Sequence, residues 1–252
     1  MKPVATVSNC DNDGKGKTRN RFSIVIPTLN EEKYIGQCLE SIKNLDYPKE
    51  DYEVIVVDGH SDDRTREIAK RYGVRLFISD VRRCGYQRQI GVNHARFNII
   101  YFIDADCIVR PDLLKQMDKL FQKKYISAVQ GKLLMYDARF LENLIGAHIY
   151  NLSLKLLAPL GRFATGGNMA IRKEVIDVIG GINKENETND DIELLHKARR
   201  YGFVAYGDKA ILETSTRRIR KWGYLKTLIY QMTNIIRYSL THTAHKGYEK
   251  LD

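Results

Sequence analysis

The chain has 252 residues, of which 43% are hydrophobic, and a formal net charge of +10. This length fits one large domain, or one domain with an appendage, and the hydrophobic fraction excludes a wholly disordered protein. No stretch reaches the roughly 18–20 unbroken apolar residues that a membrane-spanning helix needs, and the N-terminus lacks the apolar segment of a secretory signal.

The four cysteines are scattered without metal-ligand spacing, at Cys10, Cys38, Cys84 and Cys107. In a chain without an export signal they are expected to be reduced thiols, so the cytoplasm is the expected compartment. Residues 1–21, which are rich in Asn, Asp, Gly and Lys, are expected to form a flexible tail.

Strand and helix patterns alternate over residues 22–106. Short apolar runs predict strands at 22–26, 52–57, 74–78 and 99–103, and helical spacing predicts helices at 30–43, 63–72 and 85–95. Asn30 is expected to cap the first helix, with Glu31 and Glu32 in its first turn, and Gly73 to follow the second. The alternation predicts an α/β fold, with a mostly parallel sheet flanked by helices.

The second half of the chain is less regular. Its patterns predict helices at 112–123, 173–179 and 190–200, a strand at 128–134, an apolar helical stretch at 140–157 and a small-residue turn at 164–168. Residues 222–242 also read as an amphipathic helix. We therefore expect one domain over 22–215 and a basic, amphipathic helical extension over 216–252.

Polar side chains gather where three of the predicted strands end. The clusters are Pro27-Thr-Leu-Asn-Glu31, Asp58-Gly-His-Ser-Asp62 and Asp104-Ala-Asp106. Open α/β sheets bind ligands at the carboxyl ends of their strands, so the three clusters are predicted to share one site.

Asp104 and Asp106 are the predicted metal ligands. At the end of a strand, an Asp-x-Asp pair can point both carboxylates the same way. Two such oxygen ligands suit Mg²⁺ or Mn²⁺, with substrate phosphates completing the coordination. A pair of surface carboxylates without a metal is the simpler alternative.

Asp58 could accept hydrogen bonds from a ribose or a base, or it could cap the turn that follows its strand. Around it, the predicted nucleotide pocket draws on residues from all three clusters and from one helix: Pro27, Thr28, Asn30, Glu31, Asp58, Gly59, Ser61, Arg88, Asp104 and Ala105.

Four segments, in this order and spacing, resemble family 2 of the inverting nucleotide-sugar glycosyltransferases, which have the GT-A fold. They are SIVIPTLNEEKYIGQCLESI, VIVVDGHSDDRT, IYFIDAD and GGNMAIRKEVIDVIGGIN, and the similarity covers residues 22–215. The resemblance implies that Pro27, Thr28, Glu31 and Asp58 hold the base and ribose, that Arg88 approaches the nucleotide or sugar, and that Asp104 and Asp106 bind the metal.

The resemblance also assigns the acceptor side. Gly166, Gly167 and Asn168 match a loop that borders the transferred sugar, and Asp190-Asp191 matches a Glu-Asp pair whose second member is the catalytic base. Two positions depart from the family pattern, since Gln89 stands for Asn and Asp190 for Glu.

Asp191 is the expected general base. A carboxylate can take the proton of an acceptor hydroxyl as the bond to the anomeric carbon forms, and attack opposite the diphosphate inverts that centre in one step. Asp190 and Glu193 are alternative bases, and simple capping of the helix at 190–200 is the structural alternative.

The C-terminal part is strongly basic. From His196 onward, twelve lysines and arginines face four acidic residues. Arg218, Arg220 and Trp222 are expected beside the diphosphate or sugar, although a basic flank that binds anionic lipid is also open. Aromatic residues in the 222–242 helix favour peripheral contact with the cytoplasmic face of a membrane, whereas burial in the core is the default for such a stripe.

The expected function is therefore metal-assisted sugar transfer from a UDP- or GDP-linked donor to a glycan or lipid-linked acceptor. Two other classes stay open. A nucleotidyltransferase would share the sheet and the carboxylates, but no Gly-rich phosphate loop followed by Lys is found. A non-catalytic basic protein that binds nucleic acid or membranes explains the charge but not the acidic clusters, so no nucleic-acid partner is expected.

Overall fold

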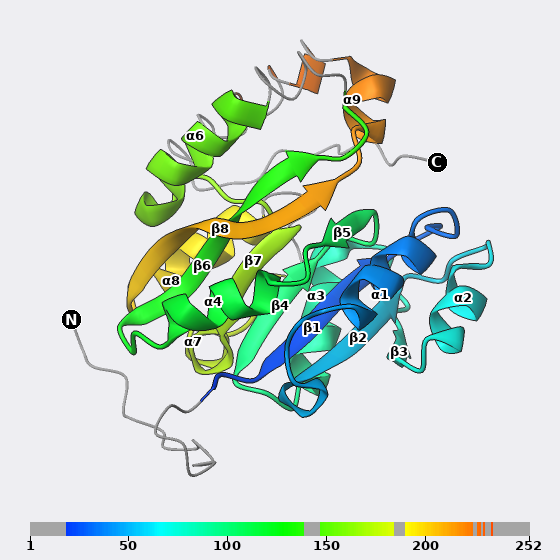
Figure 1. Ribbon diagram of the computed structural model, residues 1–252, viewed down its shortest axis with the longest axis horizontal. Helices are drawn as coiled ribbons and strands as arrows, with labels where there is room; N and C mark the ends of the chain where they lie inside the picture. Colours follow the sequence, from blue (N-terminus) through cyan, green and yellow to red (C-terminus); the bar gives the residue numbers. More distant parts are fainter. Residues whose placement is uncertain are drawn as a thin grey trace.

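The computed structural model describes residues 19–138, 147–183 and 190–223, together with positions 226, 227, 229 and 233. Its strands form an eight-stranded sheet in the order β3-β2-β1-β4-β7-β6-β8-β5 (Figure 1). The strands span β1 Phe22–Thr28, β2 Tyr52–Asp58, β3 Arg75–Ile78, β4 Ile99–Ile103, β5 Cys107–Val109, β6 Ile126–Met135, β7 Asn168–Arg172 and β8 Phe203–Thr214.

Helices cover both faces of this sheet, which confirms the predicted α/β architecture. They span α1 Ile35–Lys43, α2 Thr65–Arg71, α3 Cys84–His94, α4 Leu113–Phe121, α6 His148–Leu157, α7 Lys173–Val178, α8 Asp190–Ala198 and α9 Arg217–Trp222, with short 3-10 turns at Lys49–Asp51 and Ala158–Leu160.

The alternation of side chains along β1 divides the core into two layers. Phe22, Ile24 and Ile26 pack with α1 and α4 on one face, whereas Val25 packs with α3, α7 and α8 on the other. Because both faces are covered, the central strands are apolar at nearly every position.

The order of the parallel strands indicates where a ligand is expected to bind. β1 pairs in parallel with β2 on one side and with β4 on the other. The chain runs outward from β1 to β2 and β3, and then crosses to β4 on the opposite side of β1. Ligands of open α/β sheets bind at such a reversal of strand order, outside the carboxyl ends. Here those ends are Thr28 and the loop that starts at Asp104.

Three strands were not predicted from the sequence. β7 lies antiparallel to β4 and β6, where a turn followed directly by a helix was expected. β8, the longest strand, pairs with β6, and the register between them shifts beside Gly131. Its segment Gly207-Asp-Lys209 interrupts any apolar run, so the strand has no clear sequence signal. The short β5 pairs with the far end of β8.

The predicted start of the first helix is wrong. α1 begins at Ile35 and has no acidic residue in its first turn. Asn30 has a φ of 56°, a left-handed conformation that does not continue into a helix. Its side-chain oxygen accepts a hydrogen bond from the Asp62 N–H at 2.9 Å, so Asn30 joins two loops instead of capping α1. Gly73 does follow α2 with a positive φ, as predicted.

The predicted start of the 222–242 helix is also wrong, although the described positions 226, 227, 229 and 233 are helical. α9 ends at Trp222, and Gly223 follows with a φ of 82°. Most of residues 224–242 lie outside the described part of the chain, as do residues 140–146 of the predicted 140–157 helix and residues 1–18 of the predicted tail.

Candidate active site

The ends of β1 and β2 lie side by side, with Thr28 paired to Asp58. The Asp58 carboxylate is fully buried and accepts a hydrogen bond from the Ser61 N–H at 2.9 Å. The Thr28 hydroxyl donates to the other carboxylate oxygen at 3.3 Å. Asp58 therefore caps the turn after β2, which was the structural alternative, and its contact with a ribose remains a prediction.

Gln87 contacts the candidate site, and the sequence analysis did not identify it. Its side-chain amide donates to the Thr28 carbonyl at 2.8 Å. A Cβ on Gly59 would lie 2.5 Å from the same amide nitrogen, so a larger residue at this position would require the Gln87 side chain to move. Gln87 thus links the ends of β1 and β2 to α3, and a lone glutamine on a helix carries no motif that would reveal this.

Arg88 lies at the centre of the site. Its Nη1 donates to Asp190 Oδ2 at 2.8 Å, and its Nη2 donates to Asp104 Oδ1 at 3.3 Å. The side chain is only 6% exposed. Burial disfavours the charged guanidinium, but the nearby acidic groups, Asp190 first among them, outweigh burial and raise the pKa of Arg88. One buried cation therefore joins the end of β4 to the start of α8.

The loop before β7 contacts this centre through two glycines. A Cβ on Gly166 would lie 1.9 Å from Arg88 Nη2, and one on Gly167 would lie 2.7 Å from Asp104 Oδ2. The Gly166 N–H donates to Asp191 Oδ2 at 2.8 Å. The predicted acceptor loop, base and metal ligand thus lie within one contact network.

Asp191 has the electrostatics of a base that works near neutral pH. Burial raises the pKa of its carboxyl most strongly and the charge of Asp190 raises it further, while Arg88 and the N–H groups of Ile192 and Gly166 oppose the rise; the resulting pKa is about 6. At neutral pH the group is thus ionised yet basic enough to accept a proton.

Asp106 and Glu31 form a second acidic pair, joined by an arginine that was not among the predicted site residues. Arg217 Nη2 lies 2.5 Å from Glu31 Oε1, and Arg217 Nε lies 2.9 Å from Asp106 Oδ2. Burial raises the pKa of Glu31, whereas Arg217 opposes that rise. The sequence analysis selected Arg218 and Arg220 from this basic run, but Arg217 is the residue that reaches the predicted metal ligand.

The donor set suits a divalent cation. Asp104 and Asp106 offer carboxylate oxygens, the ligands that Mg²⁺ and Mn²⁺ prefer. A positive guanidinium already lies against Asp106, and the buried Glu31 Oε2 has no hydrogen-bond donor. In the described part of the chain, no three Asp, Glu, His or Cys side chains are grouped to hold a metal alone. Further oxygen ligands, such as those of a diphosphate, would have to complete the site.

The remaining predicted residues are placed as follows. Asn168 is buried and uses its side chain within the sheet, accepting from the Tyr101 hydroxyl at 2.8 Å and donating to the Lys132 and Ala210 carbonyls. Arg220 donates to the Asp137 carbonyl, and Trp222 ends α9. Pro27 and Ala105 are buried beside the site. The side chain of Arg218 lies outside the described residues.

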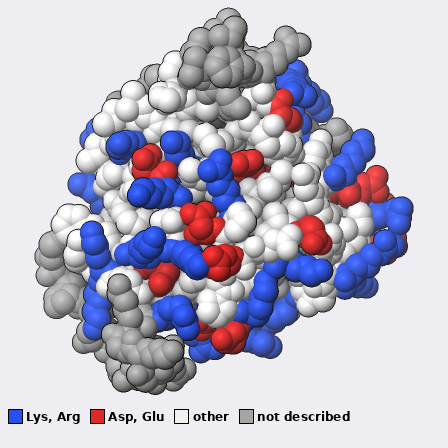
Figure 2. Space-filling model, in the orientation of Figure 1, with Lys and Arg blue, Asp and Glu red and all other residues white. Residues whose placement is uncertain are grey.

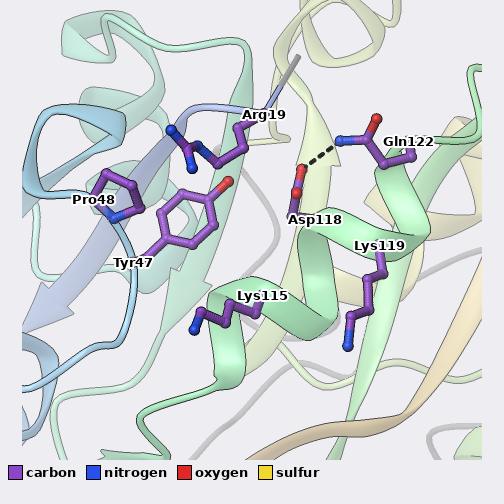
Figure 3. Close-up of a pocket in the computed structure, with 7 residues that line it drawn as sticks. All are labelled: Arg19, Tyr47, Pro48, Lys115, Asp118, Lys119 and Gln122. Atoms are coloured by element: carbon purple, nitrogen blue, oxygen red, sulfur yellow. Dashed lines mark hydrogen bonds between the residues drawn. The ribbon is translucent and has the colours of Figure 1, made fainter. Parts of the chain in front are cut away.

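A separate pocket of about 330 Å³ lies at the other end of the strands, beside the start of β1 (Figure 3). Its lining includes Arg19 and Lys115, which pair with Asp51 and Asp46 outside the lining. Asp118, on α4, accepts from Gln122 and from the Asn20 N–H. The charged groups that line this pocket are thus largely paired within the fold, and none of the predicted site residues lines the pocket.

Comparisons with known proteins find sequences and structures that are similar to this chain. A Methanococcus voltae protein named dolichyl N-acetyl-alpha-D-glucosaminyl phosphate 3-beta-D-2,3-diacetamido-2,3-dideoxy-beta-D-glucuronosyltransferase is 35% identical over 111 residues, which are 41% of this chain and 35% of that protein. The chain thus spans about a third of the length of that curated relative.

Two solved structures show the same fold. The mannosyltransferase PcManGT from Pyrobaculum calidifontis, in complex with GDP-Man and Mn²⁺, has a TM-score of 0.70 at 19% identity and covers 96% of this chain and 69% of its own. Staphylococcus aureus TarS in complex with UDP-GlcNAc has a TM-score of 0.63 at 22% identity, and the match covers 78% of this chain and 59% of the TarS chain. The sequence model for glycosyl transferase family 2 matches residues 23–180, well over half of the chain. The chain belongs to glycosyl transferase family 2.

Proposed function

We propose that this protein is an inverting glycosyltransferase that moves a sugar from a UDP- or GDP-linked donor to an acceptor hydroxyl. The nucleotide lies against the ends of β1 and β2, around Thr28, Asp58 and Ser61. The diphosphate lies beside Asp104 and Asp106, and the acceptor approaches over the Gly166-Gly167 loop. Donors of both kinds are named in complexes of proteins with this fold, UDP-GlcNAc and GDP-Man, which supports a nucleotide-sugar donor.

The single observation that carries this proposal is the bridge made by Arg88. Its guanidinium contacts Asp104 at the end of β4 and Asp190 at the start of α8. These carboxylates are far apart in the sequence, and one buried cation fixes them beside each other. This bridge supports a single site, in which the leaving group lies beside Asp104 and the proposed base, Asp191, directly follows Asp190.

The reaction needs one displacement. Asp191 accepts the proton of the acceptor hydroxyl while its oxygen bonds to the anomeric carbon, and the bond from that carbon to the diphosphate oxygen breaks. The nucleoside diphosphate leaves with the bonding electrons, and the anomeric centre inverts. A Mg²⁺ or Mn²⁺ ion held by Asp106 and Asp104 would supply positive charge that offsets the negative charge of the diphosphate.

The first test is release of nucleoside diphosphate from a panel of UDP- and GDP-sugars with Mn²⁺ present. We expect one donor to give diphosphate, and we expect Asp106→Asn to lower this rate by about 10²-fold or more, because the ion that offsets the negative charge of the leaving group loses a ligand. Asp112→Asn, which changes a carboxylate at the start of α4, is the matched control and should retain activity. Release of pyrophosphate from a nucleoside triphosphate would instead indicate a nucleotidyltransferase.

Binding to nucleic acid is the less favoured alternative. Acidic side chains lie among the basic ones across the face shown in Figure 2. A phosphate backbone on that face would meet charges of both signs, which weakens the electrostatic attraction on which such binding depends.

An exposed apolar face on α6 supports a lipid-linked acceptor at the cytoplasmic face of a membrane. On α6, Ile149, Leu152 and Leu156 are 56%, 55% and 61% exposed, while Leu154 on the opposite side is fully buried. A helix that is apolar on both sides is typical of one with a partner on each. Within the described residues no helix has the length and apolar content to cross a bilayer. The Methanococcus voltae relative carries a dolichyl phosphate in its name, which supports an acceptor of this kind.

This membrane contact can be tested by flotation with vesicles that contain anionic lipid. The triple variant Ile149→Ser, Leu152→Ser, Leu156→Ser should bind vesicles at least about tenfold more weakly than the parent, because each apolar side chain contributes on the order of 1–2 kcal/mol when buried in lipid. The matched control changes Tyr125, Val178 and Phe203 to serine, since these side chains are equally exposed on other elements. Equal flotation of the two triple variants would rule out docking through α6.

A further inference from the structure

We infer that Arg217 is a built-in counter-ion that occupies the place of the divalent cation and must be displaced when the cation binds. This inference rests on the cation site proposed above. Arg217 lies between Asp106, a predicted metal ligand, and Glu31, a predicted nucleotide-binding residue, and it is close to both carboxylates. Its side chain is 24% exposed, so it can be reached from solvent.

The two cations exclude each other for a geometric reason. Arg217 Nε lies 2.9 Å from Asp106 Oδ2, and a metal ion bonds such an oxygen at about 2.1 Å. Two positive groups a few ångströms apart would also repel each other strongly in this half-buried place. Cation binding at Asp106 therefore requires the Arg217 side chain to move away.

The contact is imperfect, which favours exchange. Arg217 Nε makes no hydrogen bond of good geometry despite its short distance to Asp106, and the second oxygen of Glu31 has no donor. A divalent ion, with two charges and water or phosphate ligands, can satisfy these oxygens better than a guanidinium held from one side.

The surroundings let the side chain move while α9 stays attached. Asp137 accepts hydrogen bonds from the Thr216 N–H at 2.7 Å and the Ser215 hydroxyl at 2.9 Å, which fixes the start of α9. The guanidinium of Arg217 lies 4.6 Å from the centre of the Tyr34 ring, a contact that holds it over the acidic pair. Exchange thus requires a new rotamer of Arg217 and the loss of the Tyr34 contact.

The test measures binding of Mn²⁺ alone to the full chain, by electron paramagnetic resonance of the free ion. Arg217→Ala should bind Mn²⁺ about tenfold more tightly than the parent, which corresponds to about 1.4 kcal/mol of competition removed. Arg217→Lys should fall between them, and Tyr34→Leu, which only loosens the arginine, should tighten binding in the same direction. Lys221→Ala removes an exposed charge from the same helix and should change the affinity by less than about twofold.

A second background makes the inference specific to Asp106. In an Asp106→Asn chain, Arg217→Ala should no longer tighten Mn²⁺ binding, because there is no shared ligand to compete for. If Arg217→Ala binds Mn²⁺ no more tightly than Lys221→Ala, or tightens binding equally in the Asp106→Asn chain, the exchange does not occur. Thermal unfolding of each variant without metal checks that it is folded.

The two proposals can fail separately. If the parent releases nucleoside diphosphate but Arg217→Ala shows no change in Mn²⁺ affinity, the exchange is refuted and the transferase stands. If Mn²⁺ affinity changes as expected but no nucleotide sugar is consumed, the exchange stands and the proposed function is refuted.

Discussion

Replacing Asp191 with asparagine should lower the rate of sugar transfer by about 10²–10⁴-fold, the usual contribution of a general base. The carboxylate accepts hydrogen bonds at 2.8 Å from the Gly166 N–H, at Oδ2, and from the Ile192 N–H, at Oδ1, and asparagine, which has one oxygen, can keep only one of the two. Asparagine keeps the size of the side chain but cannot take up the acceptor proton. The measurement is kcat with the best donor, together with donor affinity from equilibrium binding, which should change little.

The pH profile separates loss of the base from a general disturbance. With an Asp191 pKa of about 6, the parent's kcat should fall as the pH drops below that value, because the protonated carboxyl cannot accept a second proton. The remaining activity of Asp191→Asn should lack this acid limb. Glu193→Gln is the matched control on the same helix, since Glu193 pairs with Lys197 at 2.6 Å. A loss of activity in Glu193→Gln as large as in Asp191→Asn would contradict the assignment of Asp191.

The half of the site built on β1, β2 and β4 could be predicted because its signals are local. Each of these strands is a short apolar run that ends in polar residues, and parallel pairing brings such ends together. Thr28 and Asp58 are indeed direct neighbours in the sheet. The periodicity of α8 likewise placed Asp190 and Asp191 at the start of a helix, where the structure has them.

The other half depends on contacts between distant segments. β7 is inserted antiparallel between β4 and β6, and its apolar run, Met169-Ala-Ile171, is too short to predict a strand. The conformation of Asn30 is set by its bonds to the loop after β2 rather than by the helix that follows. The choice of Arg217 over Arg218 or Arg220 depends on how α9 is rotated, and α9 is fixed by Asp137 from the end of β6.

Arg88 provides the second large expected effect, this time on stability. Arg88→Met should lower the free energy of unfolding by about 3–5 kcal/mol, because removing one partner of a buried ion pair leaves a buried charge uncompensated. Asp190, whose side chain is 10% exposed, would lose its partner at 2.8 Å. Arg88→Lys should recover part of this loss, since a single ammonium cannot reach both Asp190 and Asp104 as the planar guanidinium does. The measurement is unfolding in urea at pH 7.

The matched control for Arg88 is Arg82→Met, which removes an arginine that is 43% exposed and pairs with Asp62 at 2.9 Å on the surface. That change should lower the free energy of unfolding by less than about 1 kcal/mol.

The charge of Arg88 also lowers the pKa of Asp191. In any folded Arg88 variant that lacks a positive charge, the fall of kcat at low pH should therefore begin at a higher pH than in the parent. In Arg88→Lys this acid limb should stay closer to that of the parent. An arginine that only filled space would affect unfolding without moving this limb. If the limb stays in place while stability falls, Arg88 supports the fold but does not tune the base.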